Sequence, residues 1–378
     1  MTTFRNAILV ACLAAATPAV AQDTIKIPSI IELSGGGATV GNNWKNGSNL
    51  AADEINAAGG ILGKKIVLEF VDTASDPGKA RAAIQRALDD KPVAILGPIY
   101  SGSVSATLKL TDEAQVPQII GGEAANLTAQ GSKYLFRTSF GQNVSMPKIA
   151  NYLRDDVKAK SLAVIYVNND FGKGGRDAIM KELGSRDIKV VADISTEAGQ
   201  ADFAADVIKL KGANADAIFV YLNEEESARF LREAKKQGIN KPLIGETTLL
   251  GQKVIDLAGD AANGVKGHVG LTVDAPIPAI QEFGKKFQAK FNYKPDHNGV
   301  KGYTALYMLK AAAEKAGKLD AKAIAAALHG LTITPDKVPG ILIEATWDDT
   351  GEIDRISFLG EVKDGKQVIT QTLPKLKK

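Results

Sequence analysis

A strand-to-helix junction at residues 94–110 (AILGPIYSGSVSATLKL) brings glycine and small hydroxyl residues to one point of the chain. Residues 94–96 are apolar without alternation, which is typical of a strand buried on both faces. Ser101-Gly102-Ser103 follows where a helix should begin, with Ser101 or Ser103 as a natural N-cap. Free N–H groups and the dipole of a helix N-terminus attract anions. The junction can therefore bind a carboxylate or phosphate, while a cap with a tight turn is the simpler interpretation.

Side chains suited to catalysis or metal binding are few and poorly spaced. The histidines His268, His297 and His329 lie roughly thirty residues apart, without the spacing of zinc ligands. No Gly-x-Ser-x-Gly nucleophile motif is present. The glycine clusters at 35–41 and 172–177 fit neither a dinucleotide fingerprint nor a Walker A loop. We therefore expect no enzyme, no metal site and no cofactor.

The start of the chain indicates where the protein works. Arg5 supplies a positive charge, residues 7–16 form an apolar run, and residues 17–21 (TPAVA) end in Ala-x-Ala. This pattern predicts a secretory signal peptide over residues 1–21, cleaved after Ala21, and its apolar run is too short to span a membrane. The single cysteine, Cys12, lies within it, and lipidation there is the minor interpretation. The mature chain would then lack cysteine, which excludes disulfides and thiolate chemistry.

Length and charge narrow the class of protein further. The 378 residues carry a formal net charge of +3, with lysines and acids interspersed. There is no basic tract with interleaved aromatic residues, so we expect no nucleic-acid partner. The length that remains after the signal peptide suggests two domains.

Strands alternate with helices along most of the chain. Predicted strands cover residues 24–29, 65–71, 93–96, 118–120, 161–167, 189–194, 217–221, 242–245 and 265–271. Predicted helices cover residues 46–57, 79–89, 103–114, 147–153, 174–183, 203–211, 225–237, 280–291 and 302–316, and a strand-rich tail begins at 341. Such alternation predicts parallel sheets covered on both faces. The alternation of strands and helices occurs in two sets, and a polar segment at 139–146 is expected to cross from one set to the other.

Residues 31–77 (IELSGGGATVGNNWKNGSNLAADEINAAGGILGKKIVLEFVDTASDP) resemble the opening of the branched-chain amino-acid (Leu/Ile/Val) binding proteins, which are type I periplasmic solute-binding proteins of ABC transporters. Residues 94–103, 170–172 (DFG), 230–239 (FLREAKKQGI) and 347–351 agree with the pattern, so the likeness covers nearly the whole mature chain. It implies an α/β fold of two doubly wound parallel-sheet lobes joined by a three-strand hinge. By analogy, lobe 1 covers 24–140 plus 271–345, and lobe 2 covers 141–270 plus 346–372.

The same resemblance assigns ligand contacts to turns that follow strands, where open parallel sheets bind their ligands. It implies that Ser101 binds the ligand's carboxylate, with exposed backbone at Tyr100 and Gly122 beside it. Val40 matches a position that walls the side-chain pocket. Phe171 matches an aromatic residue of lobe 2 that closes over the ligand, although a loop anchor explains it equally well.

An acidic partner for the ligand's ammonium group is the least settled part of this assignment. A desolvated ammonium needs such a partner because an unpaired buried charge is very costly. The family supplies a glutamate where this chain has Thr247, with Glu246 one residue earlier, and Glu123 is the other candidate. Asn223 matches a lobe 2 contact, and the acidic run 224–226 after it is interpreted as a first helical turn favourable to the dipole.

The resemblance implies a periplasmic protein that binds a branched-chain or other aliphatic amino acid between its lobes and delivers it to the permease subunits of an ABC transporter. We expect a monomer whose ligand is bound and released unchanged. Two alternatives stay open: the same transport role for an aromatic carboxylate or small amide, and, more distantly, the ligand-sensing domain of a receptor.

Overall fold

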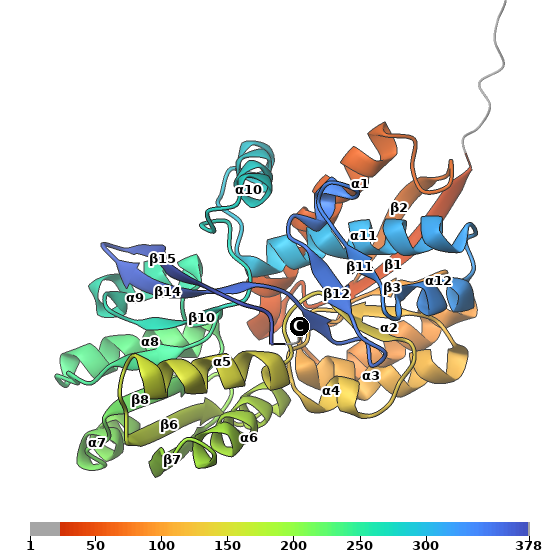
Figure 1. Ribbon diagram of the computed structural model, residues 1–378. Coiled ribbons are helices and arrows are strands. Elements are labelled where there is room, and N and C mark those ends of the chain that lie inside the picture. Colours follow the sequence, from red (N-terminus) through yellow and green to blue (C-terminus); the bar gives the residue numbers. More distant parts are fainter. Residues whose placement is uncertain (1–22, 377–378) are drawn as a thin grey trace, which may run out of the picture.

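The computed structural model describes residues 23–376, so the predicted signal peptide at 1–21 lies outside the described residues. The chain forms two lobes, each built on a sheet with helices packed against it (Figure 1). The α/β two-lobe prediction is thus confirmed. No helix within 23–376 is both long enough and apolar enough to cross a bilayer.

Lobe 1 contains a fully parallel five-stranded sheet in the order β2-β1-β3-β4-β5. Its strands are β1 (Thr24–Ile31), β2 (Lys65–Asp72), β3 (Ile95–Leu96), β4 (Gln118–Ile120) and β5 (Leu135–Arg137). The helices between them are α1 (Ala38–Ala57), α2 (Pro77–Asp89), α3 (Ser101–Ala114) and α4 (Asn126–Ala129). Each connection returns the chain to the same edge, so the carboxyl ends of the strands meet there.

Lobe 2 contains a seven-stranded sheet in the order β15-β14-β10-β9-β8-β6-β7. Its five parallel strands are β6 (Ser161–Val167), β7 (Lys189–Thr196), β8 (Ala217–Tyr221), β9 (Leu243–Gly245) and β10 (Lys266–Val269), and β14 (Ser357–Lys363) and β15 (Lys366–Leu373) join antiparallel. Its helices are α5 (Gln142–Asp155), α6 (Asp170–Gly184), α7 (Ala204–Gly212), α8 (Glu224–Lys236) and α9 (Gln252–Ala258). Every side chain of β8 is buried, as expected for a strand covered on both faces.

The remaining elements return to lobe 1. Helices α10 (Pro278–Phe291) and α11 (His297–Ala316) pack against α1, and α12 (Ala321–Leu328) packs against α11. A small antiparallel sheet follows, made of β11 (Thr332–Ile333), β12 (Ala345–Trp347) and β13 (Ile353–Asp354). The expected lobe division at 345/346 therefore falls within β12, and the chain enters the sheet of lobe 2 only at β14.

Close contact between α1 and α11 depends on glycine. A Cβ at Gly47 would lie 1.9 Å from the carbonyl oxygen of Gly299, and one at Gly302 would lie 2.2 Å from that of Trp44. Asp296 caps α11 by accepting the backbone N–H groups of residues 298 and 299 at 2.7 and 3.2 Å. Because of this cap, α11 begins at His297, five residues before the predicted start at 302. Its first turn consequently reaches the gap between the lobes.

The lobes are connected at 138–141, at 270–277 and at 355–356, and these connections meet around one aromatic ring. Phe140 lies edge-on to His268, with 5.5 Å between ring centroids. The Arg355 guanidinium lies 5.1 Å from the centre of the same ring, and Lys148 Nζ lies 4.9 Å from it. We call Phe140 of the first connection, Arg355 of the third and His268 of β10, two residues before the second connection, the hinge cluster.

A buried ion pair joins Arg137, the last residue of β5, to Glu352, which directly precedes β13. Arg137 Nε donates to Glu352 Oε2 at 3.0 Å, and the Gly141 N–H donates to Glu352 Oε1 at 3.0 Å. The two terminal nitrogens of Arg137 donate to the carbonyl oxygens of Gly122 and Ala124. The turn after β4 is thereby tied to the hinge.

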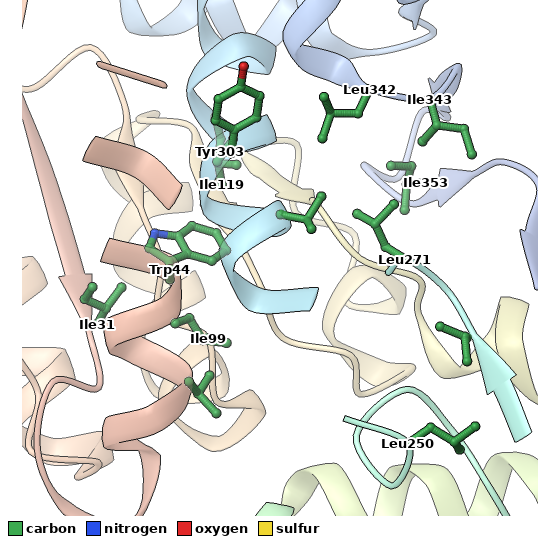
Figure 2. Close-up of a cluster of buried hydrophobic side chains, with 14 of the residues drawn as sticks. Ile31, Trp44, Ile99, Ile119, Leu250, Leu271, Tyr303, Leu342, Ile343 and Ile353 are labelled. Carbon is green, nitrogen blue, oxygen red and sulfur yellow. The ribbon is translucent and has the colours of Figure 1, made fainter. Parts of the chain in front are cut away.

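The largest hydrophobic cluster extends from lobe 1 across the connections into lobe 2. Figure 2 shows Trp44, Ile99 and Tyr303 from lobe 1 in the same cluster as Leu271 of the second connection and Leu250 of lobe 2. The two lobes therefore share part of one hydrophobic core.

Candidate functional site

A cavity of about 530 Å³ lies between the lobes and contains the junction at residue 101. Its lobe 1 wall comes from the segments that follow β1, β2, β3 and β4 and from the first turns of α11. Its lobe 2 wall comes from the segments that follow β6, β7, β8 and β9. Both walls are therefore carboxyl ends of parallel strands, the usual position of ligands in such sheets, and the volume suits a small molecule.

Six of the nine predicted site residues line this cavity, and three do not. The six are Val40, Tyr100, Ser101, Glu123, Phe171 and Asn223. Gly122, Glu246 and Thr247 are absent from its lining. The structure thus brings the two predicted turns of lobe 1 together but places the predicted glutamate of lobe 2 elsewhere.

Ser101 is the first residue of α3, and Tyr100 is the N-cap, so the predicted cap at 101 or 103 is wrong. The Ser101 hydroxyl accepts the N–H groups of Glu123 and Ala124 at 3.2 and 3.1 Å, which fixes the turn after β4. A hydroxyl still has its own hydrogen to donate. No side chain caps α3, and the N–H groups of its first three residues have no intrahelical partner. Residues 101–103 all line the cavity, so they offer an anion several donors.

The backbone of Tyr100, in contrast, is already occupied. The N–H groups of Ile99 and Tyr100 donate to the two carboxylate oxygens of Glu32 at 3.1 and 3.2 Å. Burial raises the pKa of Glu32, and these two N–H groups oppose that shift. The Gly122 carbonyl is likewise held by Arg137. The expected exposed backbone at Tyr100 and Gly122 is therefore corrected: Tyr100 borders the cavity, but its N–H is paired.

Glu123 is paired across the cavity wall with Lys301 of α11. Lys301 Nζ lies 2.6 Å from Glu123 Oε1 and 3.5 Å from the carbonyl oxygen of Gly121. Burial raises the pKa of the Glu123 carboxyl, and the Lys301 charge opposes that shift. Lys301 was not among the predicted site residues, because the predicted helix began one residue after it. The capping aspartate at 296 was the signal that could have placed it.

Glu246 and Thr247 lie behind the lobe 2 wall. The Tyr221 hydroxyl donates to Glu246 Oε2 at 3.0 Å, and His268 Nδ1 lies 3.3 Å from Glu246 Oε1. Burial lowers the pKa of His268. The Thr247 hydroxyl accepts the N–H of Gly270 at 3.0 Å. Both residues thus support the base of the lobe near the second connection, away from the cavity lining.

Glu224 is the acidic residue that the structure adds to the site. It is the first residue of α8, is half-buried and lines the cavity from lobe 2. Burial raises the pKa of Glu224 to about 7, and the nearby Asp296 and Glu226 charges act in the same direction, whereas Lys301 opposes them. Interpreting 224–226 only as a favourable helical turn was therefore incomplete, because this turn faces the opposite lobe.

The other acidic residues in the first turn of α8 pair with groups of lobe 2. Glu226 accepts the N–H of Gly199 at 2.7 Å and the side-chain amide of Asn223 at 3.1 Å. Arg229 lies 3.6 Å from Glu225. Within the described residues, Glu224 is consequently an acidic group of the cavity without a cation in hydrogen-bond contact.

Aromatic and apolar side chains complete the walls. The ring of Phe171 stacks on that of Tyr221 with 4.3 Å between centroids, so Phe171 both lines the cavity and anchors α6. Val40 contributes a buried methyl surface from the first turn of α1. No group of histidine, cysteine, aspartate or glutamate between residues 23 and 376 is arranged to hold a metal ion. The cavity thus has anion-binding donors on its lobe 1 wall and a carboxylate on its lobe 2 wall.

Comparison with known proteins gives consistent relatives. A family model described as periplasmic binding protein matches residues 24–367. The chain is 29% identical over 355 residues to the Leu/Ile/Val-binding protein BraC3 of Rhizobium johnstonii, covering 93% of this chain and 95% of that one. It is 28% identical over 359 residues to the Leu/Ile/Val-binding protein of Escherichia coli K12, with 93% and 95% covered. The crystal structure of the branched-chain amino acid transporter substrate binding protein LivJ of Streptococcus pneumoniae, in complex with isoleucine, superposes with a TM-score of 0.83 at 27% identity, covering 93% of this chain and 100% of that one.

Proposed function

Because the chain belongs to the periplasmic binding protein family, we propose that it is the solute-binding component of an amino-acid ABC import system. The proposed ligand is an amino acid, with the branched-chain and other small aliphatic amino acids as the first set to test, and it is bound between the lobes and delivered to the permease subunits. The proposed location is the periplasm, with residues 1–21 as the export signal. The role is binding and release, and the ligand is unchanged.

One observation carries the ligand class: the two walls of the cavity present opposite ends of a zwitterion with complementary groups. Lobe 1 offers the Ser101 hydroxyl and the unpaired N–H groups at the start of α3, which suit a carboxylate. Lobe 2 offers the Glu224 carboxylate, which suits an ammonium group. Since the two sets belong to different lobes, an amino acid that contacts both would hold the lobes together.

A titration panel tests this proposal. The purified mature chain, stripped of retained solutes by mild denaturation and refolding, is titrated calorimetrically with each common amino acid and with benzoate. Mass spectrometry of the solutes released in the stripping step gives an independent identification. We expect at least one amino acid to bind and benzoate not to bind. The absence of binding by every amino acid would overturn the proposal.

An aromatic carboxylate is the second candidate, because the Phe171 ring, stacked on Tyr221, offers the cavity an aromatic surface. The Glu224→Gln variant separates the two candidates by the sign of its effect. A zwitterion loses its ammonium partner and binds more weakly, whereas a bare carboxylate binds more tightly once a nearby negative charge is removed. Glu233→Gln, at the other end of α8 and paired with Lys236, is the matched control and should change neither affinity.

A further inference from the structure

We propose that the Glu123–Lys301 ion pair contacts the ligand's side chain. This contact favours an uncharged hydrogen-bonding group, a hydroxyl or primary amide, over an aliphatic group of the same shape. This inference rests on the proposed function and sets the order of preference among ligands of aliphatic size.

The pair belongs to the cavity wall and is almost removed from bulk water. Both residues line the cavity, and their side chains are only 11% and 4% exposed for Glu123 and Lys301, respectively. Lys301 is fixed by the capped first turns of α11, and Glu123 by its N–H bond to Ser101.

The pair retains hydrogen-bonding capacity that the protein does not use. An ammonium group has three donors, and those of Lys301 have two protein partners, Glu123 Oε1 and the carbonyl oxygen of Gly121. Among the residues that the structure describes, the second carboxylate oxygen of Glu123 has no protein donor. One donor and one acceptor therefore remain side by side for water or for a ligand.

The chemistry of the ligand side chain determines whether the free donor of Lys301 and the free acceptor of Glu123 form hydrogen bonds in the complex. An aliphatic group displaces water from both the donor and the acceptor and returns no hydrogen bond, which is costly for buried charged groups. A hydroxyl or amide accepts from Lys301 and donates to Glu123, so both bonds are restored. A charged side chain is attracted by one member and repelled by the other, and the pair as a whole is neutral. The best match is an uncharged group with both a donor and an acceptor.

The position of the pair relative to the anion site supports this assignment. The Glu123 N–H lies 3.2 Å from Ser101 Oγ, so the pair starts beside the proposed carboxylate contact. The proposed ammonium contact, Glu224, is on the opposite lobe and needs neither member. The third substituent of the ligand's α-carbon is therefore the group left to meet Glu123 and Lys301. Binding sites built to hydrogen-bond a substrate group discriminate strongly against analogues that lack it.

Two pairs of near-isosteric amino acids test the inference on the unmodified protein. Threonine and valine differ by a hydroxyl in place of a methyl group, and asparagine and leucine by an amide in place of an isopropyl group. We expect calorimetry to show at least about tenfold tighter binding for the polar member of at least one pair. Equal or tighter binding of both valine and leucine would overturn the inference and leave the proposed function standing. Binding of no amino acid would overturn both.

A variant that keeps the net charge locates the origin of the preference. Glu123→Leu combined with Lys301→Met removes both charges and every side-chain donor and acceptor of the pair, so we expect the polar preference to fall to within about threefold. Asp274→Asn combined with Lys294→Met removes a more exposed ion pair of similar length, 2.7 Å, outside this cavity and should leave the preference intact. Circular dichroism checks that both variants are folded. An unchanged preference in the folded Glu123/Lys301 variant would contradict the assignment, and if that variant does not fold, the wild-type comparison still decides.

Discussion

Ser101 serves two purposes at once, since its oxygen holds the turn after β4 and its hydroxyl hydrogen remains available to a carboxylate in the cavity. Replacing it with alanine should weaken amino-acid binding by about 1–3 kcal/mol, the cost of a hydrogen bond to a charged group. Because the N–H groups of Glu123 and Ala124 also lose their acceptor, unfolding stability should fall by a similar amount, on the order of 1–3 kcal/mol. Calorimetry and urea unfolding measure the two effects.

Ser105 provides the control for this change. It lies on the same helix, and its hydroxyl has no hydrogen-bond partner within the described residues. Ser105→Ala should therefore leave ligand affinity unchanged. If the folded Ser101→Ala protein binds as tightly as the wild type, Ser101 is a structural residue and the carboxylate site lies elsewhere.

Glu224 makes ligand binding depend on pH. Burial raises its pKa to about 7, so the group is mostly protonated at pH 6 and mostly ionised at pH 8. Only the ionised form pairs with an ammonium, so affinity for the amino acid should fall about tenfold from pH 8 to pH 6. Below pH 7 binding should release a proton, measurable by calorimetry in buffers of different ionisation enthalpy.

The groups that face Glu224 are Asp296 and Glu226, which raise its pKa, and Lys301, which lowers it; Tyr100 also lies near it across the cavity. The Glu224→Gln variant should bind with the same affinity at pH 6 and pH 8 and should release no proton. A pH profile that persists in this variant would assign the titration to another group.

The acidic residue of the lobe 2 wall was not predicted from the sequence. The sequence indicates which turns follow strands, and six of the predicted residues do line the cavity. It does not show how far a turn projects after its strand ends. Glu246 follows β9 directly and is held inside the lobe by Tyr221 and His268, whereas Glu224 follows β8 by three residues and reaches the cavity.

At the scale of elements, the buried Arg137–Glu352 pair links the end of β5 and the segment before β13 to the turn after β4. Glu352→Gln would leave the fully buried Arg137 charge without its partner. We expect unfolding stability to fall by about 3–5 kcal/mol, as measured by urea denaturation. Ligand affinity should fall as well, because Arg137 holds the carbonyls of Gly122 and Ala124.

An exposed ion pair gives the comparison. Arg154 and Asp155 form a bidentate contact at the end of α5, in water. Asp155→Asn should leave the urea midpoint unchanged. Equal stability of Glu352→Gln and the wild type would show that the fold tolerates the loss of this pair.

Elements with strong periodicity were predictable, whereas short elements were predicted only in part: β4 lies at its predicted residues, but β5 and α4 were not predicted. Strands such as β6 and β8, with continuous apolar runs between helices, are found where the sequence places them. Strand β5 and helix α4 contain three and four residues, too few for a periodic signal, and tertiary contacts define them. The predicted crossover at 139–146 is shorter in the structure, because α5 already begins at Gln142.

At the scale of the whole molecule, two walls on separate lobes imply an equilibrium between open and closed forms. A ligand that touches both walls binds the closed form better and shifts the equilibrium toward it. Small-angle X-ray scattering should show a smaller radius of gyration at saturating amino acid than without it. Identical scattering profiles in the two conditions would contradict hinged closure.

The hinge cluster of Phe140, His268 and Arg355 lies apart from the cavity lining, and this separation has an evolutionary consequence. Observed affinity is the intrinsic affinity of the closed form multiplied by the fraction of molecules that can adopt it. A substitution in the hinge cluster changes that fraction and so scales the affinity for every ligand by one common factor. Residues of the cavity wall, in contrast, change the ratio between ligands. The chain can therefore adapt its sensitivity to scarce or abundant nutrients without altering which nutrient it selects.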